Sequence, residues 1–466
     1  MGFVISLFYF GIYYLSPAFV LGPLAAYHVQ QIIVVLAMLV SIPELTKSFL
    51  LKTPQTLALI GLTCAVFLSR FIGSFYLSGG REALIVFVPS AVAYFLICLH
   101  CNTKKRLQVI VILMFCVCVI VISKGYSDLL NDVANSGPPP GAGIGTPTEP
   151  GSTASPYLMR QMNDQGVWTY RLQGLGEIND PNDFGQLQVC LLPLMFVFWQ
   201  PKKTFNNLAF VILPCCVLLF GLYLTHSRGA LVAITALLLF AGRRRIGIVP
   251  SIVLAGGLFL GAMALQFTGG RDISATAGED RTALWGQGME VFRTHPLFGV
   301  GFGRLWEYTD AYLTAHNSII VCSAELGVFG FYFWALFLFP TMRDAFAVSS
   351  SKMVTEGGTV IVEESPYPGV SRQTEKLDKD EFNRLGLLIF LSLMGFLVAG
   401  WFLSRAFVVT LFLLGGLAES IYQMALQRGM ISPRLPFLRV LRGSALLAVG
   451  LISAMYVLVR ILNLTK

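Results

Sequence analysis

Long apolar segments, each close to the length of a membrane-spanning helix, recur along the whole chain. A helix needs about 20 apolar residues to cross a bilayer, and about 12 to 14 such spans fit this sequence. Charged residues make up only 12% of the chain, which excludes a water-soluble globule. The sequence therefore predicts an all-α polytopic membrane protein. We place its spans near 3–25, 29–46, 56–75, 83–100, 107–124, 184–200, 206–224, 229–242, 246–267, 317–340, 385–403, 405–426 and 441–462.

Lys and Arg are concentrated in alternate loops, for example at 104–106, 202–203 and 243–245. Loops of this kind stay in the cytoplasm, so the net charge of +8 does not require a nucleic-acid partner. The predicted organisation is 1–124, N-terminal spans; 125–183, external loop with a Pro/Gly-rich insertion at 137–156; 184–267, spans; 268–316, external catalytic loop with an amphipathic helix; 317–340, one span; 341–384, cytoplasmic linker; 385–466, C-terminal spans.

Two arginines on the predicted outer side lie where an anion could bind. Arg228 stands in a tight turn, THSRG at 225–229, between two apolar segments. Asp280 is expected to cap a helix that begins at Arg281. A positive side chain at a helix N-terminus is repelled by the positive end of the helix dipole. An anion bound between Arg281 and the free N–H groups would offset this repulsion. Alternatively, Arg228 could be an ordinary interfacial anchor, and Arg281 could be a solvated side chain. The apolar face of this helix would hold Leu284, Trp285, Met289 and Phe292.

A glycine-rich turn and a histidine complete the polar groups of the outer side. The turn, HPLFGVGFGR at 295–304, follows no strand, so it does not indicate a dinucleotide-binding fold. It predicts instead a chain that turns back towards the membrane. His316 opens the next span beside Asn317, on the same side as the arginines, although a histidine at a span boundary can also be purely structural.

Several segments in this region resemble the O-antigen ligase and O-antigen polymerase superfamily. The DPND segment at 180–183, with Arg171 and Gly174 upstream, resembles the ligase-like branch. The insertion at 137–156 and the linker at 341–384 depart from a compact member of the superfamily. The other matching segments are SRGALVA at 227–233, DRTALW at 280–285, HPLFGVGFG at 295–303 and AHNSIIVCSAELGVFGF at 315–331.

The resemblance implies a glycosyltransferase that moves a glycan from undecaprenyl diphosphate to an acceptor hydroxyl. The reaction would take place on the outer, periplasmic face of the bacterial inner membrane, with no metal, nucleotide or other cofactor. By motif, His316 would be the general base, and Arg228 and Arg281 would grip the diphosphate. Further substrate-binding residues are expected to be Arg304, Arg171, Asn182, Asp183 and Asn317.

The chemistry of such a transfer suits these residue types. Guanidinium groups hold phosphate bidentately and stay charged beside a bilayer. A neutral histidine can accept the proton of the acceptor hydroxyl near pH 7, and nearby arginines would lower its pKa and keep it neutral.

Three alternatives remain open. The acceptor could be the lipid A core, a growing polymer or a protein, so a polymerase of the same superfamily is the nearest alternative to a ligase. A polysaccharide transporter is less favoured, because the polar groups cluster on one side rather than at the midplane. A divalent metal could bind the acidic segment at 177–183, which could instead cap a helix and pair with arginines.

Overall fold

The computed structural model describes residues 1–20, 28–46, 49–131, 155–162, 168–243, 246–265, 267–269, 275–350, 355–356, 359–360 and 372–464. Helices form nearly all of this part of the chain, and each predicted apolar span contains one. The chain is an all-α polytopic membrane protein, as its sequence predicts.

Eight helical segments of the described residues are long and apolar enough to cross a membrane. They are α4 (Pro54–Ser74), α5 (Leu77–His100), α6 (Lys104–Leu130), the continuous stack of α8 (Thr204–Asn207), η6 (Leu208–Ile212) and α9 (Leu213–Thr225), α13 (Ser318–Ser349), α14 (Arg372–Gly400), α15 (Val409–Gln427) and α16 (Phe437–Leu464). Shorter apolar helices are α1 (Gly2–Leu15), α3 (Val29–Leu45) and α11 (Ile248–Ala264). The two remaining predicted spans contain α7 (Pro181–Met195) and α10 (Arg228–Arg243).

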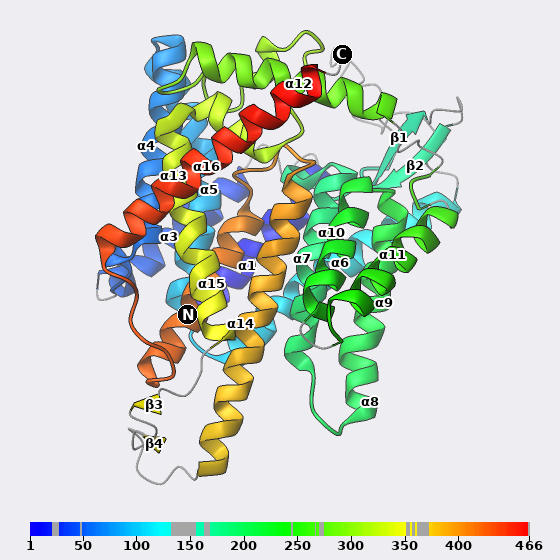
Figure 1. Cartoon of the computed structure of the whole chain (residues 1–466), viewed down its shortest axis with the longest axis vertical. Coiled ribbons are helices and arrows are strands. Elements are labelled where there is room, and N and C mark those ends of the chain that lie inside the picture. Colours follow the sequence, from blue (N-terminus) through cyan, green and yellow to red (C-terminus); the bar gives the residue numbers. More distant parts are fainter. Residues whose placement is uncertain are drawn as a thin grey trace.

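Short elements connect these helices. Strand β1 (Leu158–Met162) pairs antiparallel with β2 (Trp168–Leu172), with Leu158 opposite Leu172. Figure 1 shows this hairpin and α12 (Ala275–Thr294) at the upper end of the bundle. It shows α8, the start of α14 and the paired strands β3 (Thr355–Glu356) and β4 (Thr359–Val360) at the lower end. The other short elements are α2 (Pro17–Val20), η2 (Phe49–Lys52), η4 (Gly176–Ile178), η5 (Phe196–Phe198) and η7 (Leu305–Tyr308).

The first predicted span, 3–25, is interrupted. Helix α1 ends at Leu15, and Ser16 adopts a left-handed backbone with φ of 40°. Pro17 accounts for the break, because proline lacks an N–H and disfavours the α conformation of the residue before it. Residues 21–27 lie outside the described part of the chain.

Helices that run past the predicted spans border the predicted linker on both sides and precede the predicted insertion. Helix α13 continues to Ser349 and α14 begins at Arg372, so both ends of the predicted linker 341–384 are helical. Of the insertion at 137–156, the structure describes only the last two residues. Ser155, which is one of them, donates a hydrogen bond of 2.5 Å from Oγ to Oδ2 of Asp128 in the last turn of α6.

Helix α13 lies at the centre of the core. It packs against α4, α14, α15 and α16, and buries large side chains such as Trp334 and Phe337. By contrast, α11 and α16 leave large apolar side chains exposed, for example Leu260 and Leu446. In a bilayer these surfaces would contact lipid, because an apolar helix face without a protein partner needs an apolar solvent.

The glycine-rich turn folds back onto α13, as predicted. Helix α13 is broken at Gly327, where φ is 64° and ψ is −168°. The backbone N–H groups of Val300 and Gly301 donate to the carbonyl oxygens of residues 324 and 325, and the N–H of Val328 donates to the carbonyl of residue 296. A Cβ on Gly327 would lie 2.3 Å from the carbonyl oxygen of Leu297, so only glycine permits this close approach.

Candidate functional site

The segment that carries His316 is fixed to the loop between α14 and α15. The N–H of His316 donates to Ser404 Oγ (3.0 Å), and Ser318 Oγ donates to the carbonyl of Leu403 (2.8 Å). Asn317 caps α13, because its Oδ1 accepts from the N–H groups of residues 319 and 320, and its Nδ2 donates to the carbonyl of Trp401. Because Asn317 is fully buried and makes these contacts, its side chain positions the segment that carries His316.

The His316 imidazole lies beside charged groups and is not held by any of them. No hydrogen bond to the ring is found among the described residues. Burial lowers the pKa of His316 from its ordinary value of 6.5, and the positive charges of Arg281 and Arg405 lower it further. Asp180 acts in the opposite direction and raises this pKa. The ring is therefore neutral at pH 7 and can accept a proton.

Two other histidines of the predicted external segments differ in this respect. His226 Nδ1 lies 2.9 Å from the carbonyl oxygen of Phe267. His295 Nδ1 lies 3.0 Å from the hydroxyl of Thr294. Both rings have a partner at Nδ1, whereas no hydrogen bond to the His316 ring is found among the described residues.

Arg281 and Arg228 lie close enough for their positive charges to interact. Burial lowers the pKa of Arg281, and the charge of Arg228 lowers it further. The same Arg281 charge acts on His316, so Arg281 interacts electrostatically with both Arg228 and His316. Two guanidinium groups brought together beside a neutral base form a favourable site for a multivalent anion.

The predicted start of the external helix is wrong, although its predicted apolar face is confirmed. Helix α12 begins at Ala275, so Arg281 lies inside the helix and not at its N-terminus. An alanine-containing segment favours this extension, since alanine has the highest helix propensity. Trp285 and Met289 are buried in a cluster that includes Ile320 of α13 and Met455 of α16, Phe292 packs against this cluster, and Leu284 is also buried.

Arg171 and Asn182 form a polar network that positions Arg228. Arg171 donates from Nε to the carbonyl of Thr225 (2.9 Å) and from Nη2 to Asn182 Oδ1 (3.0 Å). Ser227, which precedes Arg228, also donates to Asn182 Oδ1 (2.9 Å). Strand β2, the first turn of α7 and the turn before α10 are thereby joined.

Asp183 forms a buried ion pair with Arg405. Arg405 Nε lies 2.7 Å and Nη2 lies 2.5 Å from Asp183 Oδ2, and Asp183 is 4% exposed. Arg405 is not among the predicted site residues, and it stands at the boundary between the predicted spans 385–403 and 405–426. A charged residue inside a long apolar segment was the signal that could have identified it.

A cavity of about 370 Å³ brings His316 together with Asp183 and Arg405. Glu325, which sequence reasoning did not single out, lies in its wall and accepts from the N–H groups of Gly303 (2.9 Å) and Leu305 (3.3 Å). The other polar or aromatic side chains that line this cavity, which we call the polar cavity, are those of Tyr13, Ser90, Glu177, Asp180, Asn182, Phe302, Thr314, Ser404 and Phe407.

Of two further predicted features, Arg304 lies apart from this grouping and the acidic segment at 177–183 belongs to it. Arg304 is paired with Glu307, with Nε 2.9 Å from Oε2, and it does not line the polar cavity. The acidic segment at 177–183 contributes three carboxylates to the cavity. Within the described residues, no three His, Cys, Asp or Glu side chains are arranged as metal ligands. Independence from metal stays a prediction.

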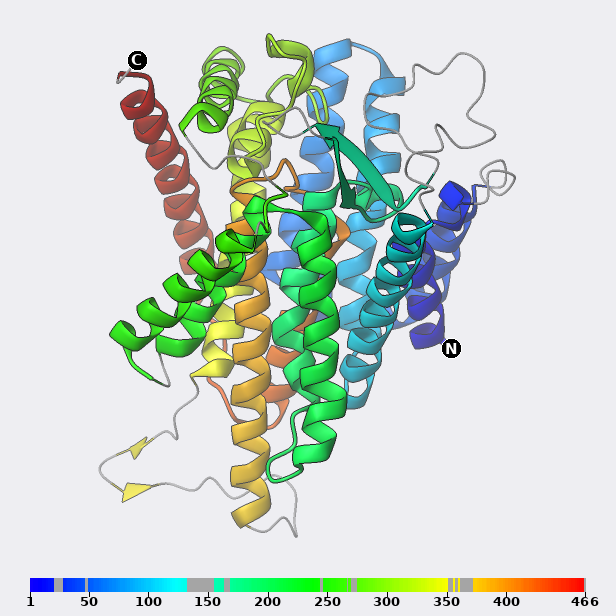
Figure 2. The same cartoon turned by 90° about the vertical axis from the view of Figure 1, so that its right-hand side faces the viewer.

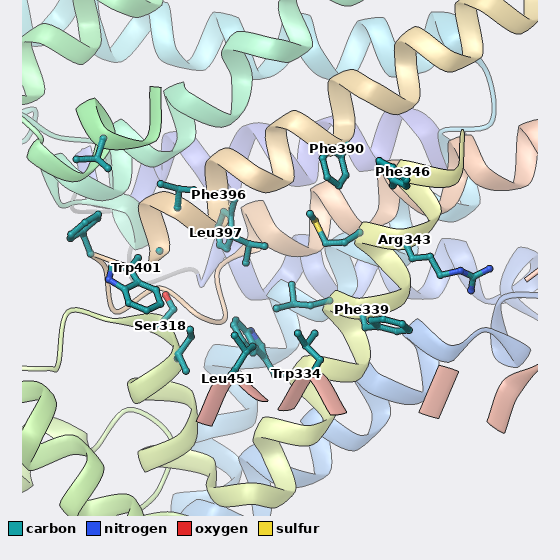
Figure 3. Close-up of a pocket in the computed structure, with 18 residues that line it drawn as sticks. Ser318, Trp334, Phe339, Arg343, Phe346, Phe390, Phe396, Leu397, Trp401 and Leu451 are labelled. Atoms are coloured by element: carbon teal, nitrogen blue, oxygen red, sulfur yellow. The ribbon is translucent and has the colours of Figure 1, made fainter. Parts of the chain in front are cut away.

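An apolar groove of about 850 Å³ lies between α13, α14 and α16. Figure 3 shows Ser318 and Trp401 at one end of this groove and Arg343 and Phe346 at the other. Trp285 of α12 packs edge-to-face on Trp401, with ring centroids 6.1 Å apart.

Residues 213–335 match the family model described as O-antigen ligase. No curated protein matches the chain. The matched segment runs from α9 into α13 and includes Arg228, Arg281 and His316. Over these residues the chain is similar to the O-antigen ligase family, as its motifs predict.

Proposed function

We propose that the protein transfers a glycan from undecaprenyl diphosphate to an acceptor hydroxyl, as an O-antigen ligase-type glycosyltransferase. The reaction would take place on the outer face of the bacterial inner membrane. Support comes from the family match, together with the grouping of a neutral histidine, two arginines and an apolar groove. The buried imidazole of His316, which has no hydrogen-bond partner among the described residues, carries the proposal together with Arg281, because the two groups offer a base and an anion-binding charge.

The proposed mechanism divides the work between these groups. The polyprenyl tail would occupy the groove between α13, α14 and α16, with the diphosphate near its outer end. His316 would accept the proton of the acceptor hydroxyl as that oxygen attacks the anomeric carbon of the donor. The bond from that carbon to the diphosphate breaks, and Arg228 and Arg281 stabilise the charge that grows on the leaving oxygen.

A deletion strain provides the direct test. Loss of the gene should remove glycan from its acceptor and leave the lipid-linked glycan to accumulate, as seen on a gel and by lipid analysis. Loss of a polymerase would instead leave acceptors that carry a single repeat unit. Unchanged glycan and lipid patterns in the deletion strain would contradict both enzymatic roles.

Donor chemistry can be tested with the purified full-length protein. In nanodiscs, it should release undecaprenyl diphosphate when it is given lipid-linked glycan and an acceptor fraction from the deletion strain. The matched control is the His316→Ala variant at equal protein concentration. Equal release by the two proteins would mean that His316 is not the base.

A further inference from the structure

A single buried carboxylate, that of Glu325, joins the glycine-rich turn to α13. Glu325 is 3% exposed, and both of its side-chain oxygens contact the backbone of the turn. Its Oε2 accepts from the N–H of Gly303 (2.9 Å), and its Oε1 accepts from the N–H of Leu305 (3.3 Å). Hydrogen bonds to a charged acceptor are stronger than neutral ones. Glu325 therefore fixes the chain at the point where the turn leads into η7.

Helix η7 continues this line of contacts to α12. Leu305, the first residue of η7, is fully buried in the same apolar cluster as Trp285 of α12. Just after η7, the N–H of Asp310 donates to Gln287 Oε1 (3.1 Å). In return, Gln287 Nε2 donates to Asp310 Oδ2 (2.7 Å). A continuous series of contacts thus runs from Glu325 through η7 to the middle of α12.

The seat of α12 on α13 determines where Arg281 lies. A Cβ on Gly288 of α12 would be 2.4 Å from Ile320 Cγ2 of α13, so the two helices are in close contact there. Arg281 and Gly288 stand at positions i and i+7, which share one face of a helix. Arg281 is therefore on the face that α12 turns towards α13. Figure 2 shows α12, in light green, at the upper end of the bundle beside the start of α13.

The charged groups around His316 come from separate elements. Burial lowers the pKa of His316, the positive charges of Arg281 and Arg405 lower it further, and Asp180 raises it. Arg281 belongs to α12, Arg405 to the loop between α14 and α15, and Asp180 to the N-terminus of α7. A shift of α12 alone would therefore change the Arg281 contribution and leave the others in place. The other charged residues that line the polar cavity are Glu177, Asp183 and Glu325.

We propose that Glu325 is a positioning residue for the transfer, which holds α12 through η7 so that Arg281 stays beside the His316 ring. The proposal rests on the proposed function and adds to it a residue that sets the distance between the base and the anion-binding charge. Both oxygens of Glu325 accept from backbone N–H groups, so it acts through the turn and η7 and contacts no substrate in this role.

Two variants interrupt this line of contacts at different points. Glu325→Gln keeps the side-chain volume, but its NH₂ group donates and cannot accept, so one of the two backbone N–H groups loses its partner. Gln287→Ala removes the contact with Asp310 at the other end, outside the buried core. The matched control is Ser323→Ala. Ser323 is also buried on α13, and its Oγ donates to the carbonyl of Ile320 in the same helix.

The main readout is the pKa of His316, which does not depend on activity. It is measured by NMR on the full-length protein in nanodiscs with isotope-labelled histidine. The chain has five histidines, and the spectrum of His316→Ala identifies the signal. The pKa should be higher in Glu325→Gln and Gln287→Ala than in the wild type and Ser323→Ala, because a displaced Arg281 lowers it less.

Two further measurements link this shift to Arg281 and to transfer. Adding Glu325→Gln to Arg281→Gln should leave the pKa of His316 where Arg281→Gln alone puts it, since two changes that act through one group are not additive. Turnover of Glu325→Gln at pH 7 should fall about tenfold, the scale expected when a buried N–H loses its acceptor. Turnover of Ser323→Ala should stay near that of the wild type.

The other outcomes overturn the proposal. A lower pKa of His316 in Glu325→Gln would mean that Glu325 acts by its own negative charge, because loss of a nearby carboxylate disfavours the protonated ring. An unchanged pKa in the folded variants would leave Glu325 with a purely structural role. If Glu325→Gln does not fold, the pKa in Gln287→Ala decides. Absence of transfer by the wild type would overturn the proposed function, whereas the pKa of His316 still decides whether Glu325 positions Arg281.

Discussion

Removal of the His316 side chain is the sharpest perturbation of the proposed mechanism. General-base catalysis contributes about 10²–10⁴-fold, so His316→Ala should raise the activation free energy by about 2.7–5.4 kcal/mol. The ring has no hydrogen-bond partner among the described residues, so its loss leaves no polar group unpaired. His316 has φ of 47°. Because asparagine tolerates this left-handed conformation, His316→Asn serves as a second variant that keeps the backbone preference.

The pH profile gives this prediction a direction. A base must be neutral, and burial together with Arg281 holds the pKa of His316 below 6.5. The wild-type rate should therefore be flat near pH 7 and fall only as the pH drops through this lowered pKa. Arg281→Gln removes a charge that lowers the pKa, so the fall should begin at a higher pH.

The assay is release of undecaprenyl diphosphate by protein in nanodiscs at a series of pH values, with donor binding measured separately. Donor binding should survive in His316→Ala, because the arginines remain. His226→Ala is the internal control, since that ring already contacts a backbone carbonyl. The reasoning is refuted if His316→Ala keeps near-normal turnover while His226→Ala loses it, which would move the centre to the turn at 225–229.

Four further predictions concern diphosphate binding by Arg228 and Arg281, independence from metal, the membrane topology and the break in α13. Arg228→Ala and Arg281→Ala should each lose about 1.5–3 kcal/mol of transition-state stabilisation, a roughly ten- to 150-fold lower turnover. Lysine at either position should restore turnover only partly. Wild-type turnover of both alanine variants would mean that the two arginines do not stabilise the diphosphate. EDTA should leave the purified enzyme active, whereas loss of activity that Mg²⁺ restores would establish a metal site. In a Cys-less background, Arg271→Cys and Arg244→Cys should react with an impermeant thiol reagent from opposite sides of the membrane; labelling from one side would invalidate the topology. Gly327→Ala should lower stability by about 1–3 kcal/mol, because alanine does not tolerate φ of 64° with ψ of −168°, and an unchanged thermal midpoint in detergent would contradict this.

The fold was largely predictable from sequence because its main determinant is local. The apolar spans and the buried face of α12 follow from hydrophobic length and periodicity. The interruption at Ser16 was also local, and Pro17 was its signal. The start of α12 was misplaced because Asp280 resembles a helix cap, and a residue of this type can equally occupy a helix interior.

The candidate site was only partly predictable, because its contacts are not local. Asp183 and Arg405 are separated by 222 positions in the sequence, and nothing near either residue identifies its partner. The roles of Arg171 and Asn182 in positioning the turn before Arg228 also depend on three separate elements that meet in space. The motifs identify His316, Arg228 and Arg281 as candidate site residues. The positions of Arg405 and of the acidic segment near His316 become apparent only in the folded structure.

The contact between Ser155 and Asp128 has a consequence for protein engineering. It joins the last turn of α6 to the segment just before β1, so the hairpin that follows has a contact with α6 that does not depend on the intervening residues. The entropy of closing such a loop grows only with the logarithm of its length, at about 0.6 kcal/mol for each doubling. Residues 132–154 therefore offer a position for an epitope or a fluorescent domain that leaves the reaction centre in place, and a handle for purifying the protein in its native lipid.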